Sequence, residues 1–70
     1  MERKTEAKMV NKFTFKYSEI EHLGLESAQW DFMEGKARED LRTSGLPYMG
    51  GEVSVDFGYD LQPTVLTIRI

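Results

Sequence analysis

His22 is the only histidine among the 70 residues of this chain, and histidine is the side chain best suited to proton transfer near neutral pH. No serine, lysine or carboxylate accompanies it in a recognised motif for nucleophilic catalysis. The chain also contains no cysteine, so thiolate nucleophiles, disulfides and thiolate zinc sites are excluded. We therefore expect His22 to be a polar residue at a turn or strand end, and the chain not to be an enzyme.

Three carboxylates, Glu52, Asp56 and Asp60, recur at every fourth position of one segment. Calcium and magnesium loops need closely spaced oxygen ligands around a glycine turn, which this spacing does not supply. The pair Gly50-Gly51 lacks the lysine and the following helix of a phosphate-binding loop. We expect the acids to keep an open face hydrated, the glycines to form a flexible joint, and the chain to bind no metal ion or cofactor.

The segments that position these residues differ in charge. Residues 1–16 hold five bases and two acids, whereas residues 17–70 hold four bases and ten acids, so a net of +3 precedes a net of −6. Residues 1–8 show no apolar period, which predicts a flexible basic arm over residues 1–9 and one domain over residues 10–70. We expect the arm to aid solubility, since the acidic body would repel a phosphate backbone.

Alternation of apolar and polar residues predicts three strands, over residues 10–17, 52–59 and 64–70. Residues 28–43 carry a helical pattern between the first two strands. The sequence therefore predicts an α+β fold with the order β-α-β-β, in which one helix covers one face of a three-stranded, mainly antiparallel sheet. A right-handed crossover, with the third strand between the other two, gives the spatial order 1-3-2.

Local signals mark the helix ends. Ser27 is the expected N-cap of the long helix, and Gly45 is its expected left-handed terminator. The segment Ser18-Glu19-Ile20-Glu21 has the spacing of a capping box. It predicts a single helical turn that ends at Gly24, with continuation of the first strand through Ile20 as the alternative.

The helical pattern separates a core face from an outer face. Trp30, Met33, Ala37 and Leu41 fall on one stripe, which we expect to face the sheet. Phe32 lies ~160° from Trp30 around the helix, so we expect it on the face opposite the core. An aromatic side chain in that position is typical of a contact surface. The alternative is that the N-terminal arm or the loop at Tyr48-Met49 folds over it.

The candidate partner surface combines this outer helix face with the loop after the helix. Gly35 is ~1 kcal/mol less favourable than alanine in mid-helix, and we expect it to allow close approach of the sheet or of a partner. The predicted partner-binding residues are Phe32, Gly35, Lys36, Tyr48 and Met49. A homodimer through this helix face would account for both Phe32 and Gly35.

A second candidate surface is the uncovered face of the sheet. Lys12, Lys16 and Arg69 would cluster there if the first and third strands are neighbours, opposite Glu52 and Asp56. Phosphate contact is the chemistry that these cations suggest, while base stacking is unsupported because the strand aromatics alternate inward. The strip is the candidate nucleic-acid-binding site in the alternative interpretation of this chain.

The last strand is densely apolar and would pair with a second chain if it lay at a sheet edge. A central position is the alternative, and the apolar density favours it. No apolar run approaches the ~20 residues of a transmembrane helix, and the cysteine-free composition favours the cytoplasm.

These observations predict a small, non-enzymatic protein-interaction or regulatory module. Chains of this length are marginally stable alone, so we expect self-association, for example as a homodimer, or a protein partner. The expected mode of action is inhibitor-like occupation of a partner's surface. The alternative is a nucleic-acid-associated protein that uses the basic arm and the basic strip.

Overall fold

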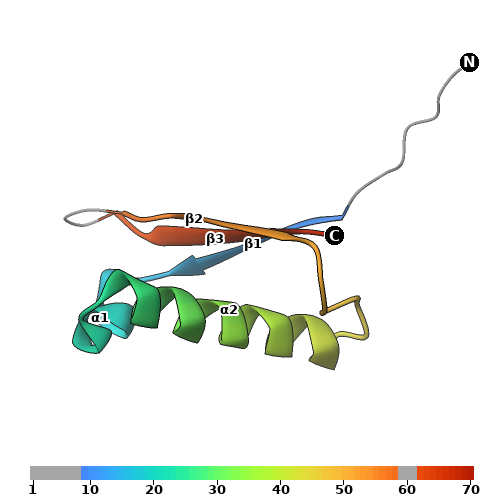
Figure 1. Ribbon diagram of the computed structural model, residues 1–70, viewed down its shortest axis with the longest axis horizontal. Coiled ribbons are helices and arrows are strands. Elements are labelled where there is room, and N and C mark those ends of the chain that lie inside the picture. The colour runs from blue at the N-terminus through green and yellow to red at the C-terminus, as the bar shows by residue number, and fades with distance from the viewer. Residues whose placement is uncertain (1–8, 59–61) are drawn as a thin grey trace, which may run out of the picture.

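The computed structural model describes residues 9–58 and 62–70. The predictions made for residues 1–8 and for Tyr59, Asp60 and Leu61 lie outside these residues. The elements in chain order are β1 (Val10–Phe15), α1 (Tyr17–Ile20), a 3-10 turn η1 (Glu21–Leu23), α2 (Glu26–Thr43), β2 (Glu52–Asp56) and β3 (Thr64–Arg69). Figure 1 shows the strands as one layer and the helices as a second layer on one side of it.

The three strands form one sheet in the order β1-β3-β2, and both neighbouring pairs are antiparallel. The long helix α2 packs against the central strand β3 (Figure 1). The predicted α+β class, the single helix layer and the spatial order are thus confirmed. The last strand was predicted to lie either at an edge or in the centre of the sheet. Because β3 pairs with β1 on one side and with β2 on the other, the central position is correct.

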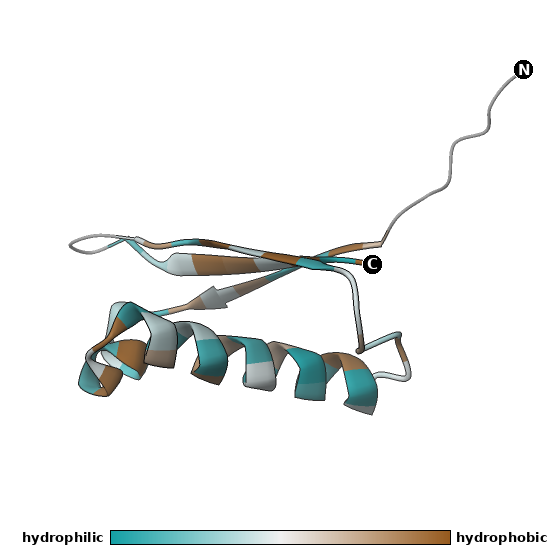
Figure 2. Ribbon diagram, in the orientation of Figure 1, coloured by the Kyte–Doolittle hydropathy of each residue, from teal (hydrophilic) through white to brown (hydrophobic). Residues whose placement is uncertain are grey.

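The core lies between α2 and the sheet. Met33, Ala37 and Leu41 of the predicted stripe are fully buried, and Leu66 and Ile68 of β3 pack against them. Figure 2 shows the hydrophobic band of β3 above a helix that carries hydrophilic residues over much of its exposed side. Within the described residues, no helix is long and apolar enough to cross a membrane.

The fourth member of the predicted stripe, Trp30, is only half-buried. Gln29 takes the core position and retains 8% exposure. Its side-chain amide donates a hydrogen bond to the carbonyl oxygen of Gly24 at 3.2 Å, so the buried polar group keeps a partner. The prediction that Trp30 lies in the core was therefore wrong, because the buried position belongs to the residue before it.

The starts of both helices differ from the sequence prediction. The first helix begins at Tyr17, and the capping contact joins the backbone N–H of Lys16 to the Glu19 carboxylate at 2.8 Å. The capping box assigned to Ser18 and Glu21 was therefore wrong by two residues. The long helix has Leu25 rather than Ser27 as its N-cap.

The end of α2 follows the prediction closely. Gly45 has a φ of 77°, the left-handed conformation expected of a terminating glycine. Its N–H donates to the carbonyl of Arg42 at 3.1 Å, and the N–H of Leu46 donates to that of Leu41 at 2.9 Å. This pair of bonds is a Schellman motif, which stops the helix and turns the chain back toward the sheet.

Candidate functional site

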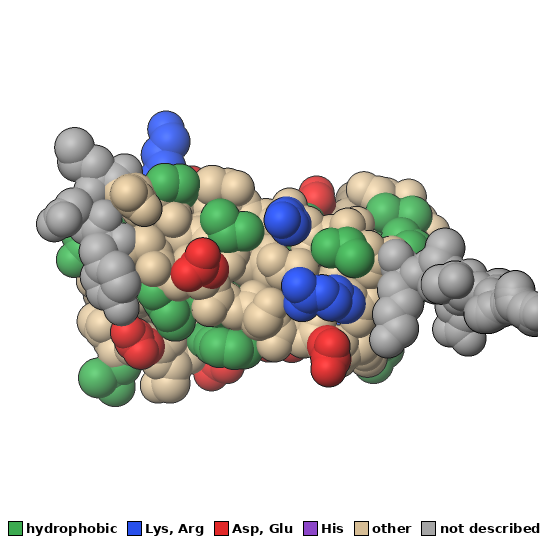
Figure 3. Space-filling view, turned by 90° about the horizontal axis from the view of Figure 1, so that it is seen from above, with side chains coloured by type: hydrophobic (Ala, Val, Ile, Leu, Met, Phe, Trp, Pro, Cys, Tyr) green, Lys and Arg blue, Asp and Glu red, His purple; other side chains and the backbone are tan. Residues whose placement is uncertain are grey.

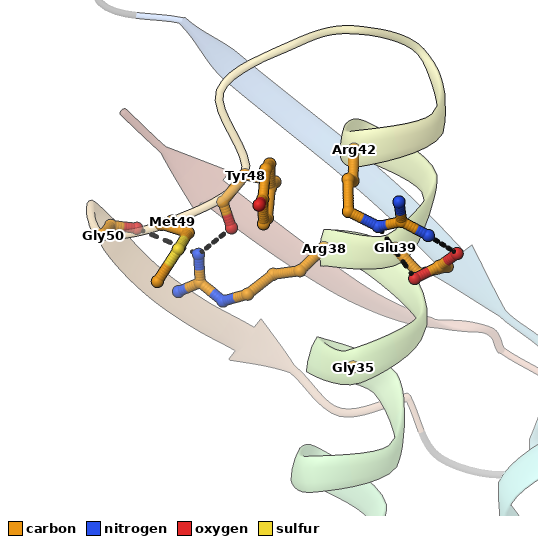
Figure 4. Close-up of a pocket in the computed structure, with 7 residues that line it drawn as sticks. All are labelled: Gly35, Arg38, Glu39, Arg42, Tyr48, Met49 and Gly50. Carbon is orange, nitrogen blue, oxygen red and sulfur yellow. Dashed lines mark hydrogen bonds and ion pairs between the residues drawn. The ribbon is translucent and has the colours of Figure 1, made fainter.

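A hollow of about 340 Å³ lies between the outer side of α2 and the loop that leads into β2. Its lining residues come from two successive turns of the helix and from the loop, and Figure 4 shows them as sticks. They are Gly35, Arg38, Glu39, Arg42, Tyr48, Met49 and Gly50. Tyr48 and Met49 also line a second hollow, together with residues 45–47 of the loop. We call these two residues, which border both hollows, the loop ridge.

Arg38 holds the loop against the helix. Its Nη1 donates to the backbone carbonyls of Tyr48 at 2.8 Å and Gly50 at 3.1 Å, as the dashed lines of Figure 4 show. Its Nε donates to the Glu34 carboxylate at 2.9 Å, and that carboxylate also accepts from the indole Nε1 of Trp30 at 3.0 Å. One guanidinium therefore ties together two turns of α2 and a loop ten to twelve residues away.

The other charged pair of the hollow lies on the helix surface. Arg42 donates to the Glu39 carboxylate through both Nε and Nη2. This hydrogen bond, and then the charge of Glu39, raise the pKa of the Arg42 guanidinium. Both side chains are more than half exposed, so we expect the pair to shape the polar rim of the hollow rather than to stabilise the fold.

Apolar surface lies beside this polar rim. Met49 is 72% exposed and Tyr48 is 38% exposed, although both are large side chains. An exposed apolar patch with charged residues around it is typical of a surface that binds protein. The arrangement suits insertion of an apolar partner side chain, with guanidinium and carboxylate groups available to its polar neighbours.

The structure brings together three of the five predicted partner-binding residues. Gly35, Tyr48 and Met49 line the same hollow, while Phe32 and Lys36 do not. Phe32 is half-buried and packs against the core, and the Lys36 ammonium lies 5.7 Å from the centre of its ring.

The placement of Phe32 away from the core was therefore wrong. Its long side chain reaches back from the flank of α2 to the edge of the core, which a helical wheel does not represent. The alternative that the Tyr48–Met49 loop covers Phe32 was also wrong, because Arg38 holds that loop on a different side of the helix. The alternative that the N-terminal arm covers it lies outside the described residues.

Gly35 is exposed, and a Cβ built on it would meet no atom within 4 Å among the residues described. The expectation that this glycine lets α2 approach the sheet closely was therefore wrong. Packing among residues 9–58 and 62–70 gives no reason for a glycine here. A side chain at this position would narrow the hollow, which Gly35 lines.

We predict that Gly35→Ala raises the free energy of unfolding by about 1 kcal/mol, because alanine is the better helix former and has open space to occupy. Urea denaturation followed by circular dichroism measures the change. A loss of stability would contradict the open environment of this position.

On the open face of the sheet, β1 and β3 place Lys12 beside Thr67 and Arg69 beside Val10. On the other side of β3, strand β2 places Glu52 beside Arg69 and Asp56 beside Val65. Figure 3 looks down on this face and shows basic, acidic and hydrophobic side chains interspersed. Lys12 and Arg69 thus share this face, with Glu52 and Asp56 across from them, as predicted. Lys16 lies beyond the end of β1.

His22 is exposed on η1. In the part of the chain that the structure describes, no group of three or more His, Cys, Asp or Glu side chains is placed to hold a metal ion. The fold and the hollow together define a small α+β domain with a polar-rimmed surface depression. No family model, curated protein or solved structure matches this chain.

Arg38, Glu39, Arg42 and Gly50 line the hollow but were not predicted as site residues. The favourable i, i+4 spacing of Glu34 and Arg38 was visible in the sequence. By itself that spacing is typical of an ordinary surface pair, and the two backbone carbonyls that Arg38 also binds carry no sequence signal. The structure shows instead that both side chains are mostly covered, at 23% and 30% exposure.

Proposed function

We propose that this chain is a small, non-enzymatic interaction module of the cytoplasm that binds another protein through the loop ridge and its hollow. The observation that carries the proposal is the position of Met49, which is 72% exposed on a loop that Arg38 holds in place. A preorganised apolar anchor beside a depression loses little conformational freedom on binding. Inhibitor-like occupation of a partner's surface is the mode of action that such a ridge supports.

The nucleic-acid alternative receives less support. Lys12 and Arg69 lie on the open face of the sheet, but Glu52 and Asp56 lie on the same face. A phosphate backbone needs a continuous positive track, and acids at these positions interrupt it. We therefore assign the function to the loop ridge.

We predict that Met49→Ser weakens the binding of the protein partner at least ~10-fold, since exposed apolar anchors carry much of the energy of such interfaces. The immobilised chain captures candidate partners from the source cells, and each identified partner is then titrated against purified wild type and variant by calorimetry.

Leu25→Ser is the matched control, because Leu25 is also 72% exposed but precedes α2 at the far end of the helix. It should leave the affinity unchanged. An equal loss of affinity in both variants, or no loss with Met49→Ser, would rule out the loop ridge as the binding site.

A further inference from the structure

The strand β1 has a free edge. Met9 and Ile70 exchange two backbone hydrogen bonds, at 3.0 and 2.9 Å, and bonded pairs alternate along an antiparallel ladder. The N–H and C=O groups of Val10, Lys12 and Thr14 therefore point away from β3. Among the described residues no strand pairs with them, so β1 presents a ready template for another strand.

The opposite edge of the sheet, on β2, is less suited to pairing with itself. An antiparallel pair with the greatest overlap would place Glu52 of one copy opposite Asp56 of the other, given the positions of the two acids in this strand. Like charges in facing positions are destabilising. Pairing of β1 with β2 of another copy would be head-to-tail and would not close after two copies. A closed dimer therefore uses β1 twice.

Asn11 carries the second observation. Its side-chain Nδ2 is buried and has no hydrogen-bond partner among the described residues. A buried donor without an acceptor is strongly unfavourable, so a rotation of the Asn11 side chain that gives Nδ2 an acceptor would be favourable. Asn11 lies on β1 itself, in the strand whose outer edge is free.

We propose that β1 pairs antiparallel with β1 of a second copy about a two-fold axis that passes beside Asn11. This register places Asn11 opposite itself in a non-hydrogen-bonded pair, where Cα atoms are ~4.5 Å apart. Each half-buried Asn11 side chain then turns toward the copy, so that its Nδ2 leaves its buried position and donates to the other's Oδ1. It places Lys12 opposite Val10 of the copy. A register centred on Lys12 would instead bring two ammonium groups together.

The product is a six-stranded antiparallel sheet with both copies of α2 on one face. Because α2 lies on β3, the two helix axes are three strand spacings apart, or ~14 Å, against 8–10 Å for helices in direct contact. Arg38 faces the loop that leads into β2, so the opposite flank of α2, with Phe32 and Lys36, faces the copy. These two predicted contact residues thus border the gap between the helices.

Single cysteine substitutions test the register, because the chain has no cysteine of its own. Only a residue on the two-fold axis meets its own copy, and the Cα separations of facing strand residues suit a disulfide. The variants Asn11→Cys, Lys12→Cys and Phe13→Cys are oxidised in a glutathione buffer as full chains. We expect Asn11→Cys to form covalent dimer at least ~10-fold faster than the other two.

Faster cross-linking of Lys12→Cys or Phe13→Cys would overturn the assignment of the axis to Asn11. Circular dichroism before oxidation establishes that each variant is folded, which matters most for Phe13 because it packs against the core. Cross-linking of none of the three variants would overturn β1 pairing altogether.

Sedimentation supplies a test without a covalent bond. Lys12→Pro removes an outward N–H and leaves the bonds between β1 and β3 in place. We expect the wild-type chain to sediment with the mass of two chains and Lys12→Pro with the mass of one, while Met49→Ser stays a dimer. A wild-type monomer at millimolar concentration would contradict the proposal, and this outcome is independent of partner binding at the loop ridge.

Discussion

Replacement of Gly51 by alanine should lower the free energy of unfolding by at least ~3 kcal/mol. Gly51 has a φ of 82°, and a Cβ on it would lie 2.5 Å from the carbonyl oxygen of Arg69. The left-handed conformation alone costs an alanine ~1–2 kcal/mol. The contact adds to this because the opposing atom belongs to the backbone of β3, which can move only if the start of β2 separates from it.

Small domains are stable by only ~5–15 kcal/mol, so this variant should unfold at a much lower urea concentration. Gly50→Ala is the matched control, because Gly50 has a φ of 76° but no atom within 4 Å of a Cβ among the residues described. It should lose only the conformational part, ~1–2 kcal/mol. Equal losses in the two variants would show that the approach of Gly51 to Arg69 is unimportant.

This pair of glycines also shows what the sequence could not supply. Gly50-Gly51 was expected to form a flexible joint, and composition alone supports no more than that. The structure gives each glycine a left-handed conformation and gives Gly51 a close contact with β3. The requirement for glycine at residue 51 arises from the backbone of Arg69 in β3, eighteen residues further along the chain.

The elements and their order were predictable because they depend on local periodicity and chain direction. The strands predicted over residues 10–17, 52–59 and 64–70 start where β1, β2 and β3 start, since each strand has one face toward α2 and therefore alternates. The observed strands are shorter and end at Phe15, Asp56 and Arg69. The order β1-β3-β2 followed from the handedness of the crossover. The capping signals at Ser18 and Ser27 were less reliable, because both helices start two residues earlier, at the N-caps Lys16 and Leu25, which make no side-chain capping bond and carry no capping signal in the sequence.

The candidate site was predictable only in part. Gly35, Tyr48 and Met49 stood out individually, as a glycine in a helix and as large side chains in a loop rich in glycine. Phe32 stood out for the same kind of reason but contacts the core. The difference depends on side-chain reach and on the side of α2 to which the loop returns, and neither is encoded in helical spacing.

Arg38 fixes the side of α2 to which the loop returns. The variant Arg38→Met should therefore lose stability and release the loop from the helix. Methionine keeps an apolar side chain of similar length but removes the hydrogen bonds to Glu34, Tyr48 and Gly50. Hydrogen bonds from a charged group contribute ~1.5–3 kcal/mol when buried. Because both side chains of the ion pair are 23–30% exposed, we expect a total loss of only ~2 kcal/mol.

The loss should concentrate in the loop. Without the guanidinium, the carbonyls of Tyr48 and Gly50 have only solvent as a partner, and Met49 is no longer held beside the hollow. We expect limited proteolysis between residues 46 and 50 to become at least ~10-fold faster, because local opening governs cleavage. The affinity for the protein partner should fall with it, since the anchor is no longer preorganised.

Arg42→Met separates this effect from a general loss of positive charge. Arg42 lines the same hollow, but among the described residues its guanidinium binds only the exposed Glu39 carboxylate, so its removal should leave both stability and loop cleavage unchanged. The two variants carry the same net charge, and they differ in whether the lost guanidinium reached the loop. If Arg42→Met opened the loop as much as Arg38→Met, electrostatic attraction rather than hydrogen bonding to the two carbonyls would hold the ridge in place.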